Sequence, residues 1–289
     1  VTYSADFKEA MKNATNGTKI TLLADIEWGV TPQSRAEITG DGKIVTLNLN
    51  GHTITGGWLD IGSNDNPTSC TLKIIGEGSH ESLGGIGGYS SVSPQATLDL
   101  SEWEGGTIST INISDDSRYE AETREAAVIV GPKAGTIGKL TFGNNQLGEL
   151  KKTKLSGGSF NEIWAANHQP VKLGELLADG YAFQNGDGSY VEYGMTLQNE
   201  FIYNVKVVKC TNHVDADDNK RCDYCNADLL HDAVASLTTG DKTYFYTDLP
   251  AAVATANGKG GTVTLLYNVT LSGTLAVGKL GTTKDITLD

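Results

Sequence analysis

Three of the four cysteines in this 289-residue chain lie in one short polar segment, together with a histidine. Cys210, His213, Cys222 and Cys225 follow the spacing C-x2-H-x8-C-x2-C. Two short chelating pairs separated by a loop are what tetrahedral zinc binding needs, because each pair can bind the metal from one turn. Three thiolates and one imidazole would fill all four positions. The spacing therefore predicts a structural zinc site, with His231 as a spare ligand, that supplies folding free energy to the segment.

The same cysteines also allow a disulfide, because cysteine pairs persist in oxidising compartments. Cys210 could pair with Cys222 or Cys225, whereas a bridge between Cys222 and Cys225 would close a strained short loop. The fourth cysteine, Cys70, lies inside a strand pattern, and we expect it to be a small buried apolar residue.

A third interpretation of the segment is a calcium loop. Four oxygen-bearing side chains occupy positions 1, 3, 5 and 9 of an EF-hand-like motif: Asp215, Asp217, Asn219 and Asp223. Lys220 stands where the motif has glycine, and Asn226 stands where it has glutamate. Calcium is therefore an alternative to zinc, or a second ion beside it.

Other residues with possible chemistry lie outside this segment. Asp115 and Asp116 follow a strand, and paired carboxylates on a β-helix can act as acid and base in glycoside cleavage. Trp28, Trp58, Trp103 and Trp164 could stack on sugars, although tryptophans at strand ends more often belong partly to the core. We expect structural roles for His52 and His168, and a surface turn at residues 84–89, which lack the context of a nucleotide loop.

The elements that must position these residues are short strands. Short strand-like runs with alternating apolar positions, interrupted or followed by Gly, Asn or Asp, recur within 19–26, 43–54, 70–78, 96–108, 109–116, 126–145 and 154–160. Glycine supplies 35 residues, about 12% against a usual value of about 7%. Pairs such as Asn50-Gly51, Gly105-Gly106 and Gly157-Gly158 are typical of tight corners. We predict an all-β right-handed parallel β-helix, with a β-sandwich as the alternative.

Two short helices complete this pattern. Residues 5–15 place Phe7, Ala10, Met11 and Ala14 on one helical face, with Ser4 or Asp6 as the cap. A short helix of this kind is expected to cover the N-terminal end of a solenoid, where unpaired strand groups would be exposed. A second helix is predicted over 171–179.

An internal repeat predicts the domain organisation. Residues 2–26 align with residues 243–269, so that Asp6 matches Asp248 and Leu22-Leu23 matches Leu265-Leu266. We expect a β-helix module at 1–205, a metal-binding Cys/His connector at 206–235, and the start of a second, truncated module at 236–289. The chain begins with Val1, so it reads as a fragment of a longer multi-module protein.

The formal net charge of −13 and the distribution of apolar residues argue against two function classes. Phosphate binding needs clustered Lys and Arg, so the acidic balance argues against a nucleic-acid partner. The sequence has no run of about 18 apolar residues, so no membrane insertion is expected in this fragment.

Several segments resemble the repeated extracellular modules of large Firmicutes surface proteins, which are pectate-lyase-like β-helices. They are LLADI, VTLNLNGHTITGG, KLSGGSF, LGELLADGYAF and CTNHVDADDNKRCDYCNADL. The resemblance spans nearly the whole chain and implies a secreted or cell-surface protein with adhesive or glycan-directed roles. This sequence departs from pectin-active enzymes, because it has no clustered Asp calcium site with a matching Arg or Lys base on the coils.

These observations together predict a non-catalytic, adhesin-like module that binds a glycan or a host surface protein. The first alternative is a carbohydrate-active enzyme, a polysaccharide lyase or glycoside hydrolase, with Asp115 and Asp116 as its carboxylates. The second alternative is a structural stalk.

Overall fold

The computed structural model describes residues 6–63, 68–113, 126–143, 152–165, 170–211, 213–217, 219–229, 233–278 and 285–289. The chain forms two compact units. The first, called the solenoid unit below, holds residues 1–178, 183–191 and 195–208. The second, called the C-terminal unit, holds residues 179–182, 192–194 and 209–289. Within the described residues, no helix is both long enough and apolar enough to cross a membrane.

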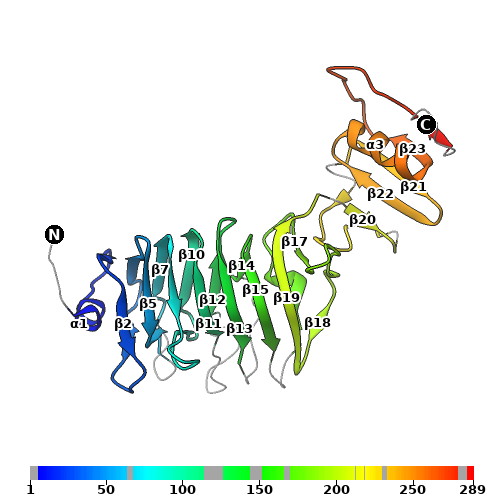
Figure 1. The fold of residues 1–289 in the computed structure, drawn as a ribbon. Coiled ribbons are helices and arrows are strands. Elements are labelled where there is room, and N and C mark those ends of the chain that lie inside the picture. The colour runs from blue at the N-terminus through cyan, green and yellow to red at the C-terminus, as the bar shows by residue number, and fades with distance from the viewer. Residues whose placement is uncertain are drawn as a thin grey trace. The chain divides into compact units, whose positions relative to one another are not determined.

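One face of the solenoid unit is a six-stranded sheet in which every neighbouring pair is parallel. Its order is β1 (Lys19–Thr21), β4 (Ile44–Asn48), β7 (Thr71–Gly76), β10 (Thr97–Trp103), β12 (Ala127–Val130) and β14 (Lys154–Leu155). Lys19 pairs with Thr46, and Thr46 pairs with Lys73, so each of these two coils takes 27 residues. Strands one coil apart in sequence therefore lie side by side, as in a solenoid (Figure 1).

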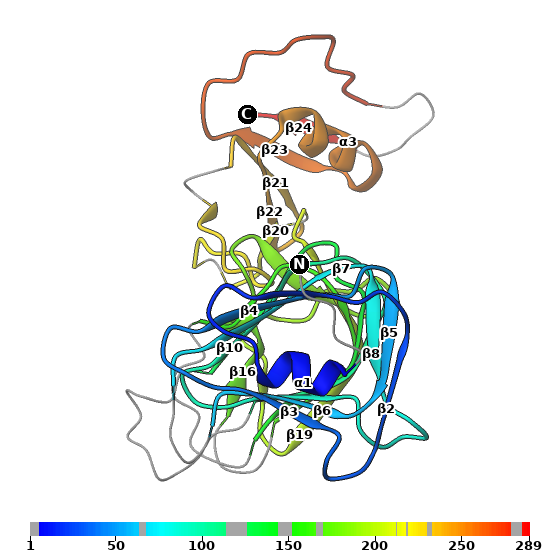
Figure 2. The same ribbon diagram turned by 90° about the vertical axis from the view of Figure 1, so that its left-hand side faces the viewer.

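A second parallel sheet lines the rest of each coil. It holds β2 (Ile26–Gly29), β5 (His52–Gly56), β8 (Gly78–Glu81), β11 (Thr107–Ile113), β13 (Thr136–Phe142) and β15 (Ser159–Ala165). In the early coils a third row consists of β3 (Arg35–Ile38), β6 (Trp58–Ile61) and β9 (Tyr89–Val92), and β9 pairs with β11. The strands enclose one interior (Figure 2), which confirms the predicted parallel β-helix over the β-sandwich.

The interior consists of ladders of apolar side chains, one from each coil. Val45 pairs with Leu72, Leu72 with Leu98, and Leu98 with Val128, and all four are fully buried. Polar side chains alternate with them and face outward. Each coil thus buries its apolar face only by stacking on the next, and burial contributes about 1.5–3 kcal/mol for each such side chain.

Glycine allows the sharp corners between faces. Gly106 has a φ of +87°, and a Cβ there would overlap the carbonyl oxygen of Gly78 on the preceding coil. Asn50 and Gly51 both have positive φ, at 51° and 82°. The predicted corners at Gly105-Gly106 and Asn50-Gly51 are therefore confirmed, because both need a left-handed backbone that glycine and asparagine tolerate.

The N-terminal end is covered by α1 (Phe7–Lys12), which packs against β3 and lies across the opening of the first coil in Figure 2. Asp6 is its cap, since its side chain accepts the N–H of Glu9 at 3.1 Å. Met11 is fully buried. The capping helix is thus confirmed, but it is shorter than the predicted range 5–15, because Asn13, a poor helix former, follows its last residue as the C-cap.

The other end of the solenoid differs from the prediction. Residues 171–179 form β16 (Val171–Lys172) and a single 3-10 turn, η2 (Leu173–Leu176), so the helix predicted there was wrong. Leu177 bridges to Leu155, and the N–H of Ala178 bonds to the carbonyl of Leu155 at 2.9 Å. Pairing with the last coil thus competes with helix formation at this point.

Four further strands belong to this end: β16, β17 (Tyr181–Gln184), β18 (Thr196–Leu197) and β19 (Glu200–Lys209). β16 and β18 form an antiparallel pair. The long strand β19 lies antiparallel on β15, so it ends the parallel stack.

The described residues of the C-terminal unit form a five-stranded sheet and the helix α3. The sheet order is β20 (His213–Asp215), β22 (Lys242–Tyr246), β21 (Ala235–Thr239), β23 (Gly261–Leu265) and β24 (Ile286–Leu288). Helix α3 (Leu249–Lys259) contributes Leu249, Ala252, Val253 and Ala256 to a buried core with strand residues such as Leu237. The Cys/His segment shares this sheet, because β20 pairs with β22.

Over the described residues, the aligned segments 6–26 and 248–269 have the same order of elements. In each, a short helix precedes a strand: α1 precedes β1, and α3 precedes β23. Each strand then pairs in parallel with a strand one coil length later, since Lys19 pairs with Thr46 and Gly261 pairs with Ile286.

Candidate metal centre

Four side chains of the C-terminal unit converge on one point, and short backbone contacts hold the segments that carry them. Cys210 follows β19, and its N–H donates to the carbonyl of Gly180 at 2.8 Å. His213 begins β20, and Cys222 and Cys225 lie in the turn beyond it. The N–H of Asp223 donates to the carbonyl of Val214 at 2.8 Å, which holds this turn against β20.

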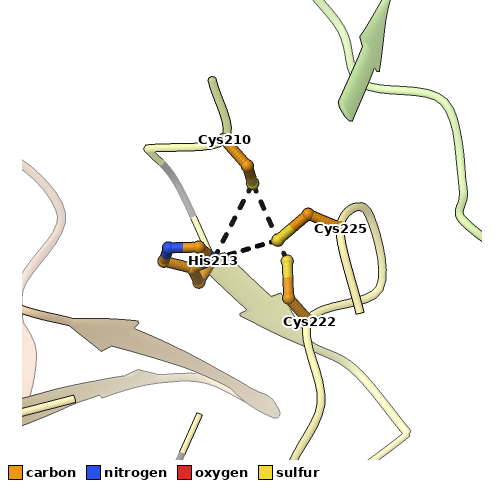
Figure 3. Close-up of side chains that lie close together, drawn as sticks. All are labelled: Cys210, His213, Cys222 and Cys225. Atoms are coloured by element: carbon orange, nitrogen blue, oxygen red, sulfur yellow. Dashed lines mark hydrogen bonds between the residues drawn. The ribbon is translucent and has the colours of Figure 1, made fainter. Parts of the chain in front are cut away.

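The distances between the donor atoms match a tetrahedron around a metal ion. The sulfurs of Cys210 and Cys222 are 3.9 Å apart, and His213 Nδ1 lies 3.7 Å from the sulfur of Cys210 and 3.5 Å from that of Cys225 (Figure 3). With bond lengths of about 2.3 Å to sulfur and about 2.0–2.1 Å to nitrogen, a regular tetrahedron has edges of about 3.8 Å and about 3.6 Å. The four donor atoms all lie within 4.8 Å of one another, so they could hold one metal ion.

The turn between Cys222 and Cys225 aims both sulfurs inward. The N–H of Tyr224 donates to the sulfur of Cys222 at 3.5 Å, and the N–H of Asn226 donates to the carbonyl of Cys222 at 2.8 Å. Asn226 has a φ of +56°, a left-handed conformation that asparagine tolerates and most residues do not. The sequence C-D-Y-C-N therefore closes a tight turn, and both of its thiols reach the cluster.

The titration of these groups shows why a cation suits the cluster. Hydrogen bonding with Cys222 raises the pKa of the Cys210 thiol, whereas hydrogen bonds from Cys210 and Cys225 lower the pKa of Cys222. Hydrogen bonds to the same Cys222 and Cys225 sulfurs raise the pKa of His213 to about 10. A thiolate at Cys222 thus keeps protons on Cys210 and His213, and a bound metal ion would supply the positive charge that replaces those protons.

The disulfide interpretation does not agree with this geometry. All four cysteines are free, and the 3.9 Å between the sulfurs of Cys210 and Cys222 is nearly twice the length of a disulfide bond, about 2.05 Å. Cys70 is buried in the solenoid, as predicted, and its Sγ donates to the carbonyl of Ile38 at 3.0 Å.

Three carboxylates of the predicted calcium loop also come together. Asp215, Asp217 and Asp223 place their oxygens within 4.8 Å of one another. Burial raises the pKa of Asp223. The carboxylate of Asp215 accepts the N–H groups of Asn219 and Lys220, both at 3.0 Å. These bonds shape the chain between His213 and Cys222, so the acidic residues have a structural role in the candidate metal centre.

Asn219, the fourth predicted oxygen ligand of the calcium loop, uses its side chain in other hydrogen bonds. The side-chain oxygen of Asn219 accepts the N–H of Arg221 at 2.8 Å, and its amide donates to Asp217 at 2.8 Å.

The remaining predicted candidates do not join this site. Asp115, Asp116, His168 and His231 lie outside the described residues. His52 lies 3.3 Å from Asp25 on the solenoid surface. Trp103 is fully buried and donates its Nε1 to the carbonyl of Gly78 at 2.9 Å, and Trp28 packs edge-on against Phe7 at 5.1 Å. These two tryptophans therefore belong to the packing of the solenoid, in agreement with the core interpretation.

Sequence reasoning missed a group of side chains around Trp164. Phe201 and Tyr203 stack in line with it, and the Lys139 ammonium lies over the Trp164 ring at 5.2 Å. The available signal was the alternation of aromatic residues in FIYNV, which places Phe201 and Tyr203 on the same face of a strand.

Comparison with known proteins adds no assignment: no family model, curated protein or solved structure matches this chain.

Proposed function

We propose that Cys210, His213, Cys222 and Cys225 bind one structural zinc ion. Three soft sulfur donors and one imidazole nitrogen suit zinc and do not suit calcium, which takes oxygen ligands. Four protein ligands leave no coordination position for water or substrate, so the role is structural. The tetrahedral spacing of the donor atoms carries this proposal.

Elemental analysis of the purified protein tests the zinc proposal. One zinc per chain is expected, and a zinc content near zero with intact thiols would refute it. Calcium measured in the same sample tests the acidic loop of Asp215, Asp217 and Asp223 separately, because an Asp217→Asn variant would lose a calcium ion there and keep the zinc.

We propose further that the chain is a non-catalytic module of a secreted or cell-surface bacterial protein, and that it binds a glycan or a host surface protein. The resemblance to pectate-lyase-like surface modules supports the location and the membership of a longer multi-module chain. The net charge of −13 argues against a nucleic-acid partner.

One observation favours a binding role over a purely structural stalk. Large aromatic side chains, Phe201 and Tyr203, stand exposed on the outer face of the solenoid instead of in its interior. Exposed aromatic groups of this kind mark sites of interaction. An array of glycans and host surface proteins, probed with the zinc-loaded chain, tests the role. No ligand above background would refute it in favour of a stalk.

The enzyme alternative rests on the sequence position of Asp115 and Asp116, which begin two residues after Ile113, the last residue of β11. A polysaccharide digestion screen separates the two functions. A binding module shows no turnover, whereas turnover that is abolished by Asp116→Asn would establish a carbohydrate-active enzyme with this carboxylate in its active site.

A further inference from the structure

A row of aromatic rings crosses the outer surface of the solenoid where β15 meets β19. Trp164 lies directly opposite Phe201 across the two strands, and Tyr203 follows two residues later on the same face of β19. The rings of Trp164 and Phe201 are 5.9 Å apart with planes 18° from parallel. Those of Phe201 and Tyr203 are 5.7 Å apart with planes 10° from parallel. These three rings form what we call the aromatic platform.

An ion pair borders the platform. The ammonium of Lys139 lies over the rings of both Trp164 and Phe201, at 5.2 Å and 5.7 Å, so both rings turn a face toward the same cation. The same ammonium contacts the carboxylate of Glu162 at 2.6 Å, and Glu162 lies directly opposite Tyr203. Hydrogen-bond donors and acceptors therefore stand beside the apolar rings, and their charges neutralise each other.

The platform is more exposed than packing alone requires. Phe201 is 43% exposed and Tyr203 is 55% exposed, whereas Ile202 between them points inward and is 9% exposed. Ile202 and Val205 already supply the apolar side of β19. The rings thus add little to the interior, and they present apolar area to the solvent, where a ligand can cover it.

We propose that the aromatic platform binds a neutral polysaccharide, which deepens the binding role proposed above and rests on it. A pyranose ring has a face of C–H bonds that packs on an aromatic ring, and a rim of hydroxyl groups that suits the Glu162 carboxylate and the Lys139 ammonium. Acidic polysaccharides and nucleic acids fit poorly. The chain carries a net charge of −13, and Glu162 neutralises the cation of the platform.

Residues paired across neighbouring strands extend the proposed binding surface beyond the platform. From Tyr203, the outward row runs through Glu162, Lys139, Thr110 and Tyr89 to Trp58, each directly opposite the next on neighbouring strands. Six strands at about 4.8 Å spacing make this row about 24 Å long. Aromatic side chains stand at both ends, so a linear chain of several sugars should bind more tightly than a single sugar.

Affinity electrophoresis of the zinc-loaded full chain tests this proposal. The gels contain soluble β-glucan, xylan or mannan as neutral polysaccharides, or polygalacturonate as an acidic one. We expect at least one neutral polysaccharide to retard the protein, with at least tenfold weaker binding in Tyr203→Ala and Phe201→Ala. Tyr203→Phe should keep most of the affinity, because it retains the ring. Tyr267→Ala is the matched control, since Tyr267 in the C-terminal unit is also 55% exposed.

Each other outcome contradicts the proposal. Failure of all three neutral polysaccharides to retard the folded protein overturns it, as does retardation by polygalacturonate alone. Retardation that Tyr203→Ala leaves unchanged, with an unchanged thermal unfolding midpoint, places the glycan elsewhere. Binding to a host protein that these variants do not affect leaves the general binding role intact but removes the platform from it. Binding to a protein through the platform shows a protein ligand instead.

Discussion

Removal of one metal ligand, in the variant Cys225→Ser, should unfold the Cys/His segment while the solenoid stays folded. Among the described residues of 210–229, three of the buried side chains are the cysteines themselves, and the buried apolar ones are Val214 and Leu229. Those two contribute about 3–6 kcal/mol by burial. A structural zinc ion contributes about 10–16 kcal/mol, so metal binding stabilises the segment more than apolar burial does.

Amide hydrogen exchange measures this effect residue by residue. The N–H groups of Cys222 and Asp223 bond to the carbonyls of Ala227 and Val214 and should exchange slowly only with zinc bound. In the wild-type chain, free zinc at a thousandfold excess over its dissociation constant should raise the free energy of opening by about 4 kcal/mol. A chelator should remove that increment. The amide of Leu49, bonded to Ile75 inside the solenoid, should not respond.

Cys70→Ala is the matched control, because it removes a buried cysteine far along the sequence from the segment. It should bind one zinc with unchanged affinity. The reasoning fails if chelation leaves the amides of Cys222 and Asp223 protected, or if Cys225→Ser binds zinc as tightly as the wild-type chain.

Two further predictions concern the solenoid. His80 is fully buried, with Nε2 bonded to the carbonyl of Gly56 at 3.0 Å, and burial lowers its pKa to about 4. In the unfolded chain the pKa of a histidine is about 6.5. The contribution of His80 to the free energy of unfolding is therefore fully present above about pH 6.5, and that free energy falls by about 3 kcal/mol as the pH drops to about 4. Urea unfolding at several pH values should show this slope, and His80→Gln should abolish it. Gly106→Ala should cost more than about 2 kcal/mol, because its Cβ meets the carbonyl of Gly78, whereas Gly105→Ala, with open space around its Cβ, should cost about 1 kcal/mol. Equal losses in the two glycine variants would contradict the close approach.

The features that sequence reasoning found are the local ones. Strand alternation is visible within a few residues, as in 43–54, and the Asn50-Gly51 corner needs a left-handed backbone that few residues allow. The cysteine spacing was equally local, because the chelating pairs 210–213 and 222–225 each fit one turn. The predicted helix at 171–179 is the exception, since helical periodicity there was overridden by pairing with the last coil.

The features that it missed depend on register between distant residues. Lys139 meets Glu162 only because one coil separates them, and Trp164 meets Phe201 only because β19 returns antiparallel to β15 after the strands β16, β17 and β18. The coil length varies, so spacing alone does not specify these partners. His80 is similar, since a histidine inside an apolar ladder gives no periodic signal that separates it from a surface residue.

β19 links the end of the fold to the proposed binding surface. A parallel solenoid presents an unpaired strand edge at its last coil, and such an edge can pair with other chains. An antiparallel strand occupies that edge and does not continue the coil, so β19 protects β15. Its inward positions, such as Ile202 and Val205, must remain apolar to cover the interior. Its outward positions carry no such constraint, because no further coil stacks on them in parallel register. Exposed rings such as Phe201 and Tyr203 are therefore compatible with closing the parallel stack, and β19 can carry a ligand surface without weakening the core.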